Sequence, residues 1–258
     1  METNRLKRVV QILFFTAVFF NQCQRAADKA PLLLPLEEKA RVQYVSYVTN
    51  EKNELLYTMD YFDRQYVRAD TASDQITHYY IEKNQLKRFY TEERNTIFQE
   101  IKIDLAAYAV NGGFPYHNSI PFSYWKPVFK NDRGKGTSWS VHADTQFVCL
   151  DASGKPHTLH YRFSGKARFD GWSKIFVPAD RTREFKVLHV HWPEFENSLF
   201  DLTDNENVWL QKGSASDYFE PEFGLLRSIA DYTISKKKEP AVKRKSTWEL
   251  YLLLIPGK

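Results

Sequence analysis

Cysteine is scarce in this sequence, with Cys23 and Cys149 the two examples among 258 residues. Two cysteines cannot build the multi-disulfide framework that stabilises many small secreted domains. No asparagine begins an Asn-x-Ser or Asn-x-Thr motif, so nothing in the sequence indicates a glycosylated eukaryotic ectodomain. We therefore expect the fold to depend on a hydrophobic core rather than on covalent cross-links.

Familiar catalytic motifs are also missing. The chain has no Gly-x-Ser-x-Gly elbow, and Gly134-Lys135-Gly136 lacks both the glycine spacing and the Lys-Ser/Thr ending of a phosphate-binding loop. Cys149 lies in an apolar run typical of a strand, where burial would keep the thiol inert. These absences favour a noncatalytic protein.

A strong charge of one sign is absent as well. The formal net charge is +4, and residues 1–22 carry a net +2 of it through Glu2, Arg5, Lys7 and Arg8. A chain without those residues would carry about +2, which is too little to steer it toward nucleic acid. We expect no nucleic-acid partner.

The N-terminus has the order of an export signal. Three basic residues, Arg5, Lys7 and Arg8, precede an apolar run at residues 9–20, and the chain then becomes polar. A membrane-spanning helix needs about 20 mostly apolar residues, so this run favours a cleaved signal over a permanent anchor.

Residues 5–23 resemble a bacterial lipoprotein signal, because the apolar run leads to Cys23, whose thiol could carry lipid. Phe20 and Gln22 depart from the family pattern, which has an aliphatic and a small residue at these positions. The resemblance implies a signal peptide at residues 1–22, a lipid such as palmitate on Cys23, and a place in the bacterial cell envelope. Two alternatives stay open: ordinary signal cleavage near residues 26–27, or a Cys23–Cys149 disulfide.

The rest of the chain divides into a short tether and one domain. Residues 23–39 contain Pro31 and Pro35 and predict a lipidated tether, and residues 40–258 predict a β-rich globular domain. The 19 Phe, 15 Tyr and 6 Trp favour strands, because flat rings pack well on a pleated surface.

Alternation of apolar and polar residues predicts antiparallel hairpins. The clearest joins residues 145–150 to residues 157–163, where Leu159, Tyr161 and Phe163 share one face. Residues 218–234 instead approximate helical spacing, with Pro221 near the start. The predicted fold is mainly β, an antiparallel sandwich or open barrel with one late α-helix.

The sharpest metal candidate is His189-Val190-His191, because residues two apart on a strand point to the same side. A third imidazole or a carboxylate would complete the site, and the candidates are His160, His142, Glu194 and Glu196. In the alternative interpretation the residues between and beside the histidines face the core, and His189 and His191 face water or a neighbouring strand.

Two tryptophans are candidates for binding a glycan or a protein partner. Trp125 and Trp172 lie in segments predicted to be in or near loops, where an exposed ring could stack on a sugar or anchor a protein. The alternative is that both rings plug the ends of the β core.

Together these features favour a noncatalytic cell-envelope lipoprotein whose β domain is structural or binds an unknown protein or glycan, with the membrane reached through the lipid. The alternative is a secreted metal-dependent or glycan-acting enzyme that uses the His189 and His191 face. No cofactor is expected for the first hypothesis, and a divalent metal for the second.

Overall fold

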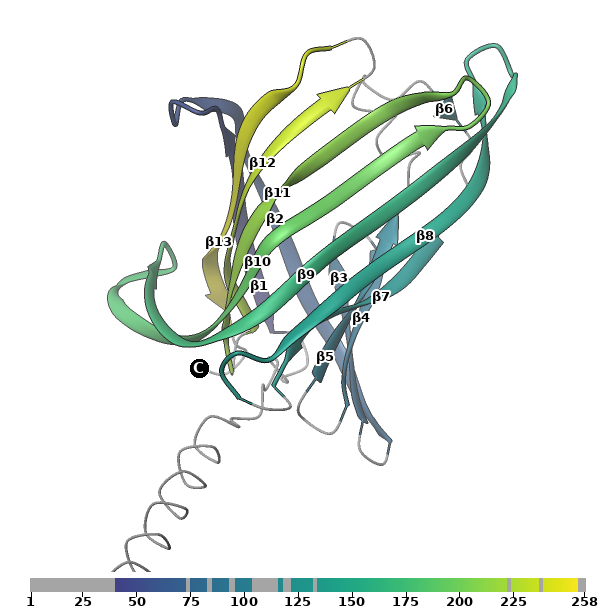
Figure 1. Cartoon of the computed structure of the whole chain (residues 1–258). Helices are drawn as coiled ribbons and strands as arrows, with labels where there is room; N and C mark the ends of the chain where they lie inside the picture. Colours follow the sequence, from purple (N-terminus) through teal and green to yellow (C-terminus); the bar gives the residue numbers. More distant parts are fainter. Residues whose placement is uncertain are drawn as a thin grey trace, which may run out of the picture.

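The protein is described by a computed structural model, in which the chain forms strands from Arg41 onward (Figure 1). The described residues are 40–72, 75–82, 85–92, 96–103, 116–117, 122–131, 134–221, 224–236 and 239–254. The predicted signal peptide, Cys23 and the predicted tether lie outside them.

Thirteen strands are present in these residues. The first seven are β1 (Arg41–Thr49), β2 (Leu55–Ala72), β3 (Gln75–Glu82), β4 (Gln85–Glu92), β5 (Thr96–Ile103), β6 (Tyr116–His117) and β7 (Phe122–Lys130). The remaining six are β8 (Ser138–Asp151), β9 (Pro156–Val177), β10 (Asp180–Asp201), β11 (Glu206–Glu220), β12 (Gly224–Lys236) and β13 (Val242–Leu254).

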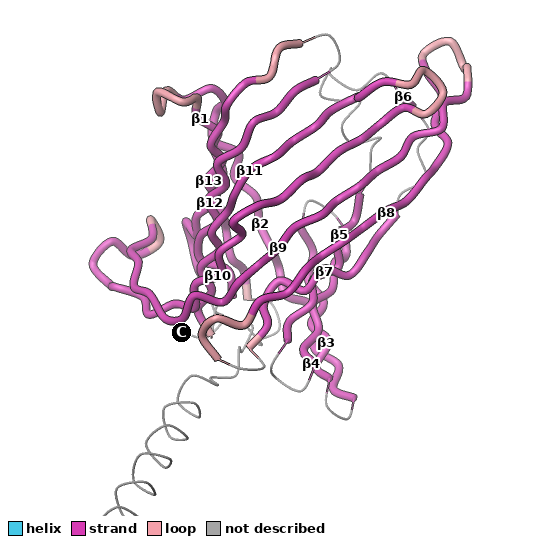
Figure 2. Tube along the Cα trace, in the orientation of Figure 1, coloured by secondary structure: helices cyan, strands magenta, loops and turns pink. Residues whose placement is uncertain are grey.

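All thirteen strands belong to one antiparallel sheet, ordered β6-β8-β9-β10-β11-β12-β13-β1-β2-β3-β4-β5-β7. The sheet is strongly curved, so that β7 lies near β8 and β9 although they are far apart in the strand order (Figures 1 and 2). The indole Nε1 of Trp139 in β8 donates to the carbonyl of Pro127 in β7 at 2.9 Å. Phe129 and Phe169 also meet edge to face, with ring centroids 5.2 Å apart. One open sheet therefore covers its own apolar face.

The core has two parts on this inner face. The larger cluster draws on both ends of the strand order and includes Val42, Tyr80, Phe129, Phe169 and Leu188, all fully buried or nearly so. A smaller cluster lies toward the β6 end of the sheet and contains Tyr116, Cys149, Leu159, Tyr161, Leu199 and Val208. Cys149 is buried there, and burial raises the pKa of its thiol to about 11.

Strand β9 has the two-residue period that the sequence predicts. Leu159 and Tyr161 are buried, while His160 and Arg162 lie on the other face. The strand pairs with β8 through a turn at residues 151–156. The predicted hairpin is confirmed, and both of its strands are longer than the alternation alone indicated.

Two irregularities shape the long central strands. The register of β10 shifts relative to both of its neighbours, β9 and β11, between residues 191 and 195, around Pro193. Proline cannot donate a ladder hydrogen bond, so within a central strand it is confined to such bulges. In β9, Gly171 has φ 98°, a left-handed conformation that favours glycine, beside another register shift.

The predicted helix at residues 218–234 is wrong. Residues up to Glu220 complete β11, and Gly224, with φ 77°, begins β12, which pairs with β11 and β13 on its two sides. Leu226 is fully buried and its neighbours are less so, the two-residue period of a strand. Pairing on both edges overrides the weak helical spacing.

The prediction of a mainly β, antiparallel fold is confirmed by this open sheet. No helix in the described part of the chain is long and apolar enough to cross a membrane.

The curved sheet predicts different costs for two phenylalanines of β9. Phe169→Ala should lower the free energy of unfolding by about 3–5 kcal/mol, because the ring is fully buried where β7 and β9 meet. Phe176→Ala should change it by less than about 0.5 kcal/mol, because that ring is 51% exposed. Urea denaturation of both variants measures the difference, and equal costs would contradict this packing.

Candidate functional site

The candidate site lies at one end of the sheet, where the β8–β9 and β10–β11 turns meet. Asp151 builds the first turn: its Oδ1 accepts hydrogen bonds from the backbone N–H groups of Ser153 at 2.8 Å and Lys155 at 2.9 Å. Gly154 supplies the left-handed residue of the turn, with φ 84°. The turn places His157 just inside the start of β9.

Asp201 builds the second turn in the same way. Its Oδ1 accepts the backbone N–H groups of Thr203 at 2.8 Å and Asp204 at 3.2 Å. The two turns are tied together, since the N–H of Thr158 donates to the Thr203 hydroxyl at 2.9 Å and the N–H of Leu202 donates to the Thr158 carbonyl at 2.9 Å. Residues 44 positions apart in sequence therefore share one polar centre.

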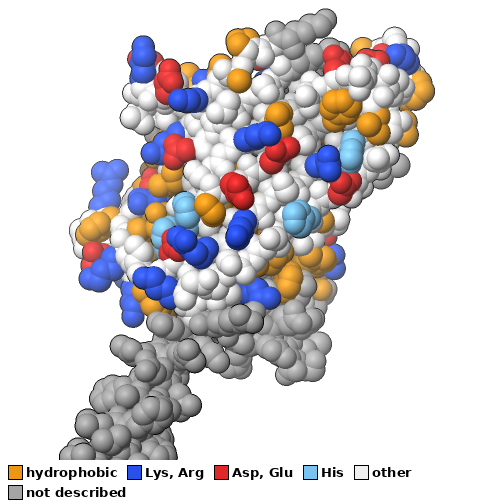
Figure 3. Space-filling model, in the orientation of Figure 1, with side chains coloured by type: hydrophobic (Ala, Val, Ile, Leu, Met, Phe, Trp, Pro, Cys, Tyr) orange, Lys and Arg blue, Asp and Glu red, His pale blue; other side chains and the backbone are white. Residues whose placement is uncertain are grey.

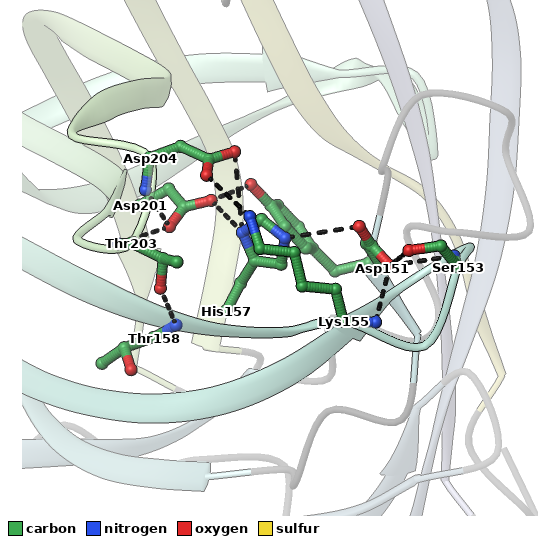
Figure 4. Close-up of polar contacts among 9 residues, drawn as sticks. Asp151, Ser153, Lys155, His157, Thr158, Asp201, Thr203 and Asp204 are labelled. Carbon is green, nitrogen blue, oxygen red and sulfur yellow. Dashed lines mark hydrogen bonds and ion pairs between the residues drawn. The ribbon is translucent and has the colours of Figure 1, made fainter.

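His157 lies at the middle of this centre, between Asp201 and Asp151 (Figure 4). Its Nδ1 is 2.7 Å from Oδ2 of Asp201, and the same oxygen accepts the Tyr116 hydroxyl at 2.5 Å. On the other side, its Nε2 is 3.4 Å from Oδ2 of Asp151. His157 is 4% exposed and Asp201 is fully buried. Because Tyr116 belongs to the smaller core cluster, this network borders that cluster.

The network keeps its carboxylates ionised. Hydrogen bonds from the Ser153 hydroxyl and the turn backbone lower the pKa of Asp151 to about 2. Burial raises the pKa of Asp201, but hydrogen bonds from Tyr116, His157 and the turn backbone lower it more, so the net pKa lies below its ordinary value. Burial, and then the bond to Asp201, raise the pKa of Tyr116, which stays a neutral donor.

The histidines predicted as metal ligands lie on the other face of the sheet. Leu188, Val190 and Trp192 are buried, and His189 and His191 point away from them, partly exposed. His189 stacks on Tyr218 with centroids 4.7 Å apart, and Nδ1 of His191 is 3.4 Å from the Ser216 hydroxyl. The two imidazole centroids are 6.2 Å apart.

His160 does not lie near His189 and His191. It pairs with Asp144, its Nε2 2.6 Å from the carboxylate, and it lies opposite Phe200, eleven residues along β10 from His189. At about 3.3 Å per residue this separation exceeds roughly 30 Å. Figure 3 shows histidines scattered among charges of both signs on the drawn face rather than gathered at one point.

Both tryptophan candidates lie within strands, Trp125 in β7 and Trp172 in β9, so the expectation that they lie in or near loops is wrong. Trp125 is 36% exposed, with the Arg88 guanidinium 5.2 Å from its ring centroid. Trp172 packs partly buried against the larger core cluster, and the Lys186 ammonium lies 4.5 Å from its ring centroid. Binding by either ring stays a prediction.

The sequence pattern did not single out His157 or Asp201 as site residues, and it indicated Tyr116 only as one of several aromatic residues near loops. The nearest signal was the position of His157 directly after an Asp-Ala-Ser-Gly turn, which places it at the entrance of a strand. Its partners Tyr116 and Asp201 come from two other segments, too far away in sequence to form a local motif with His157.

No protein-family model matches this chain, and no curated protein matches it. Two crystal structures match this chain. A predicted lipoprotein from Parabacteroides distasonis ATCC 8503 is 14% identical, with 87% of this chain and 99% of that chain covered, at a TM-score of 0.50. A predicted exported protein with a YmcC-like fold from Bacteroides fragilis NCTC 9343 is 11% identical, with 88% and 100% covered, at a TM-score of 0.41. At this identity, the first likeness establishes a shared fold alone.

Asp201→Asn tests the network. The substitution should lower the free energy of unfolding by about 1–3 kcal/mol at neutral pH, because it removes a buried charged acceptor from Tyr116 and His157. Since the pKa of Asp201 is lowered in the folded protein, this stabilisation is full above about pH 4 and is lost as the pH falls through the folded value.

Asp144→Asn is the matched control, because Asp144 forms a similar contact with His160 on the exposed face. It should leave the unfolding midpoint unchanged. Denaturation of both variants between pH 3 and pH 7 measures the effect, and a pH-independent cost for Asp201→Asn would contradict the ionised network.

Proposed function

We propose that this chain is an exported bacterial envelope lipoprotein, tethered to a membrane by lipid on Cys23, whose β domain is structural or binds a protein or glycan without catalysing a reaction. The observation that carries the proposal is the order of basic residues, apolar run and cysteine across residues 5–23. The shared fold with a predicted lipoprotein supports it.

The chain offers a tether of useful length between the lipid and the domain. The described sheet begins at Arg41, so 16 residues, 24–39, separate Cys23 from Ala40. A fully extended chain of that length reaches at most roughly 55 Å. That reach would let the domain stand clear of the membrane surface and meet a partner there.

The chemistry of the described domain supports a noncatalytic role. Asp201, the most buried carboxylate of the candidate site, is engaged by four hydrogen-bond donors from Tyr116, His157, Thr203 and Asp204. Cys149 is the free thiol of the described chain, and its burial and raised pKa disfavour a nucleophilic role. Hydrogen bonding of the first group and burial of the second disfavour a catalytic role for either.

Membrane retention tests the anchor. In a bacterial host that processes lipoproteins, the native chain should sediment with membranes, and Cys23→Ala should move to the soluble fraction because the acyl chains are lost. Cys149→Ala is the matched control: it removes the other thiol, buried in the domain, and should leave sedimentation unchanged. Equal retention of the native chain and Cys23→Ala would refute the proposal.

A further inference from the structure

Three potential metal ligands converge from the two turns of the candidate site. His157 Nδ1 lies 2.7 Å from Asp201 Oδ2 and 3.8 Å from Asp204 Oδ2. The ligand atoms of these three residues all lie within 4.8 Å of one another, and within the described chain they form the one such group. Bonds of about 2.0–2.2 Å to one ion place its donor atoms roughly 3–4 Å apart, so small movements would suffice.

The second nitrogen of His157 points to a missing ligand. Nδ1 is 2.7 Å from Oδ2 of Asp201, which also accepts the Tyr116 hydroxyl, so this side of the ring is engaged. Nε2 is buried and has no hydrogen-bond partner, and it faces Oδ2 of Asp151 at 3.4 Å. A buried ring nitrogen that makes no hydrogen bond is unfavourable.

A cation on Nδ1 would resolve this conflict. It would take the place of the Nδ1 hydrogen, and the proton of the neutral ring would then be on Nε2, from where it would donate to Asp151. Metal-bound histidines usually donate their other N–H to a carboxylate or carbonyl in this way. Tyr116 and the backbone N–H groups of Thr203 and Asp204 would continue to hold the Asp201 carboxylate.

The local charge also favours a cation. Three carboxylates, Asp151, Asp201 and Asp204, surround the imidazole, and Lys155 contacts Asp204 at 3.3 Å. The Lys155 side chain is 54% exposed, so it can move into water when an ion approaches. Three carboxylates against one lysine leave a net negative charge around the ligand atoms in either protonation state of the imidazole.

We propose that His157, Asp201 and Asp204 bind one divalent transition-metal ion, with Asp151 as the positioning residue that orients the imidazole. One nitrogen and two carboxylate ligands suit Zn²⁺, Mn²⁺ or Fe²⁺. The ion would join the β8–β9 and β10–β11 turns, and the proposal is independent of lipid on Cys23.

Titration of the purified full chain with Zn²⁺ after removal of bound metal tests the site. Calorimetry should give one ion per chain, and Co²⁺ should give the visible absorption of a nitrogen- and oxygen-ligated ion. Asp204→Asn should weaken Zn²⁺ binding at least about tenfold, and Asp151→Asn about tenfold. The Asp204 side chain is 34% exposed, so its variant should fold, and circular dichroism checks this.

Two controls address the other histidines. His160→Gln removes the exposed His160–Asp144 pair, and the double variant His189→Gln/His191→Gln removes the pair on the outer face. Both should retain native affinity.

A readout that needs no variant is the long-range ¹H–¹⁵N spectrum of the imidazoles. The His157 hydrogen should be on Nδ1 without metal and on Nε2 with Zn²⁺. Absence of stoichiometric binding would overturn the proposal. Binding lost in the double variant, or unchanged in folded Asp204→Asn, would also overturn it.

Discussion

The structure depends on one antiparallel sheet that curves far enough to bury its own apolar face. Because every strand pairs with its neighbours in a single order, the two ends of that order can share a core only through side-chain packing. Phe129 on Phe169, and Trp139 bonded to the Pro127 carbonyl, make this closing contact. Phe129, Phe169 and Trp139 are therefore buried where β7 approaches β8 and β9.

The candidate site is a consequence of the strand order, in which β6, β8, β9, β10 and β11 are successive neighbours. Strand β6 pairs with the end of β8 and places Tyr116 beside the two turns that hold His157 and Asp201. Each turn is organised by an aspartate that accepts backbone N–H groups, so the two carboxylates are positioned by local chemistry and joined by the imidazole. The polar network thus seals the end of the smaller core cluster.

Local signals predicted much of this architecture. The alternation of Leu159 and Tyr161 with His160 gave the β8–β9 hairpin, and the buried Leu188, Val190 and Trp192 match the interpretation that turns His189 and His191 away from the core. The alternation of apolar and polar residues and the chemistry of turns act within a few residues, so both can be predicted from the sequence.

The failures came from contacts distant in sequence. Residues 218–234 have apolar spacing compatible with a helix, but strands on both sides impose pairing on β12. Trp172 adjoins Gly171, which reads as a turn, yet the glycine serves a bulge inside β9. The His157 network joins three segments that lie close together because of the strand order. No local sequence motif could therefore predict it.

The central claim is that this β domain is held at a membrane by lipid on Cys23. Mass spectrometry of the native protein's N-terminal peptide tests it most directly. The account predicts a peptide that begins at Cys23 and carries the added mass of a diacylglyceryl group. A peptide that begins near residue 27, or one that contains Cys23 without lipid, would contradict it.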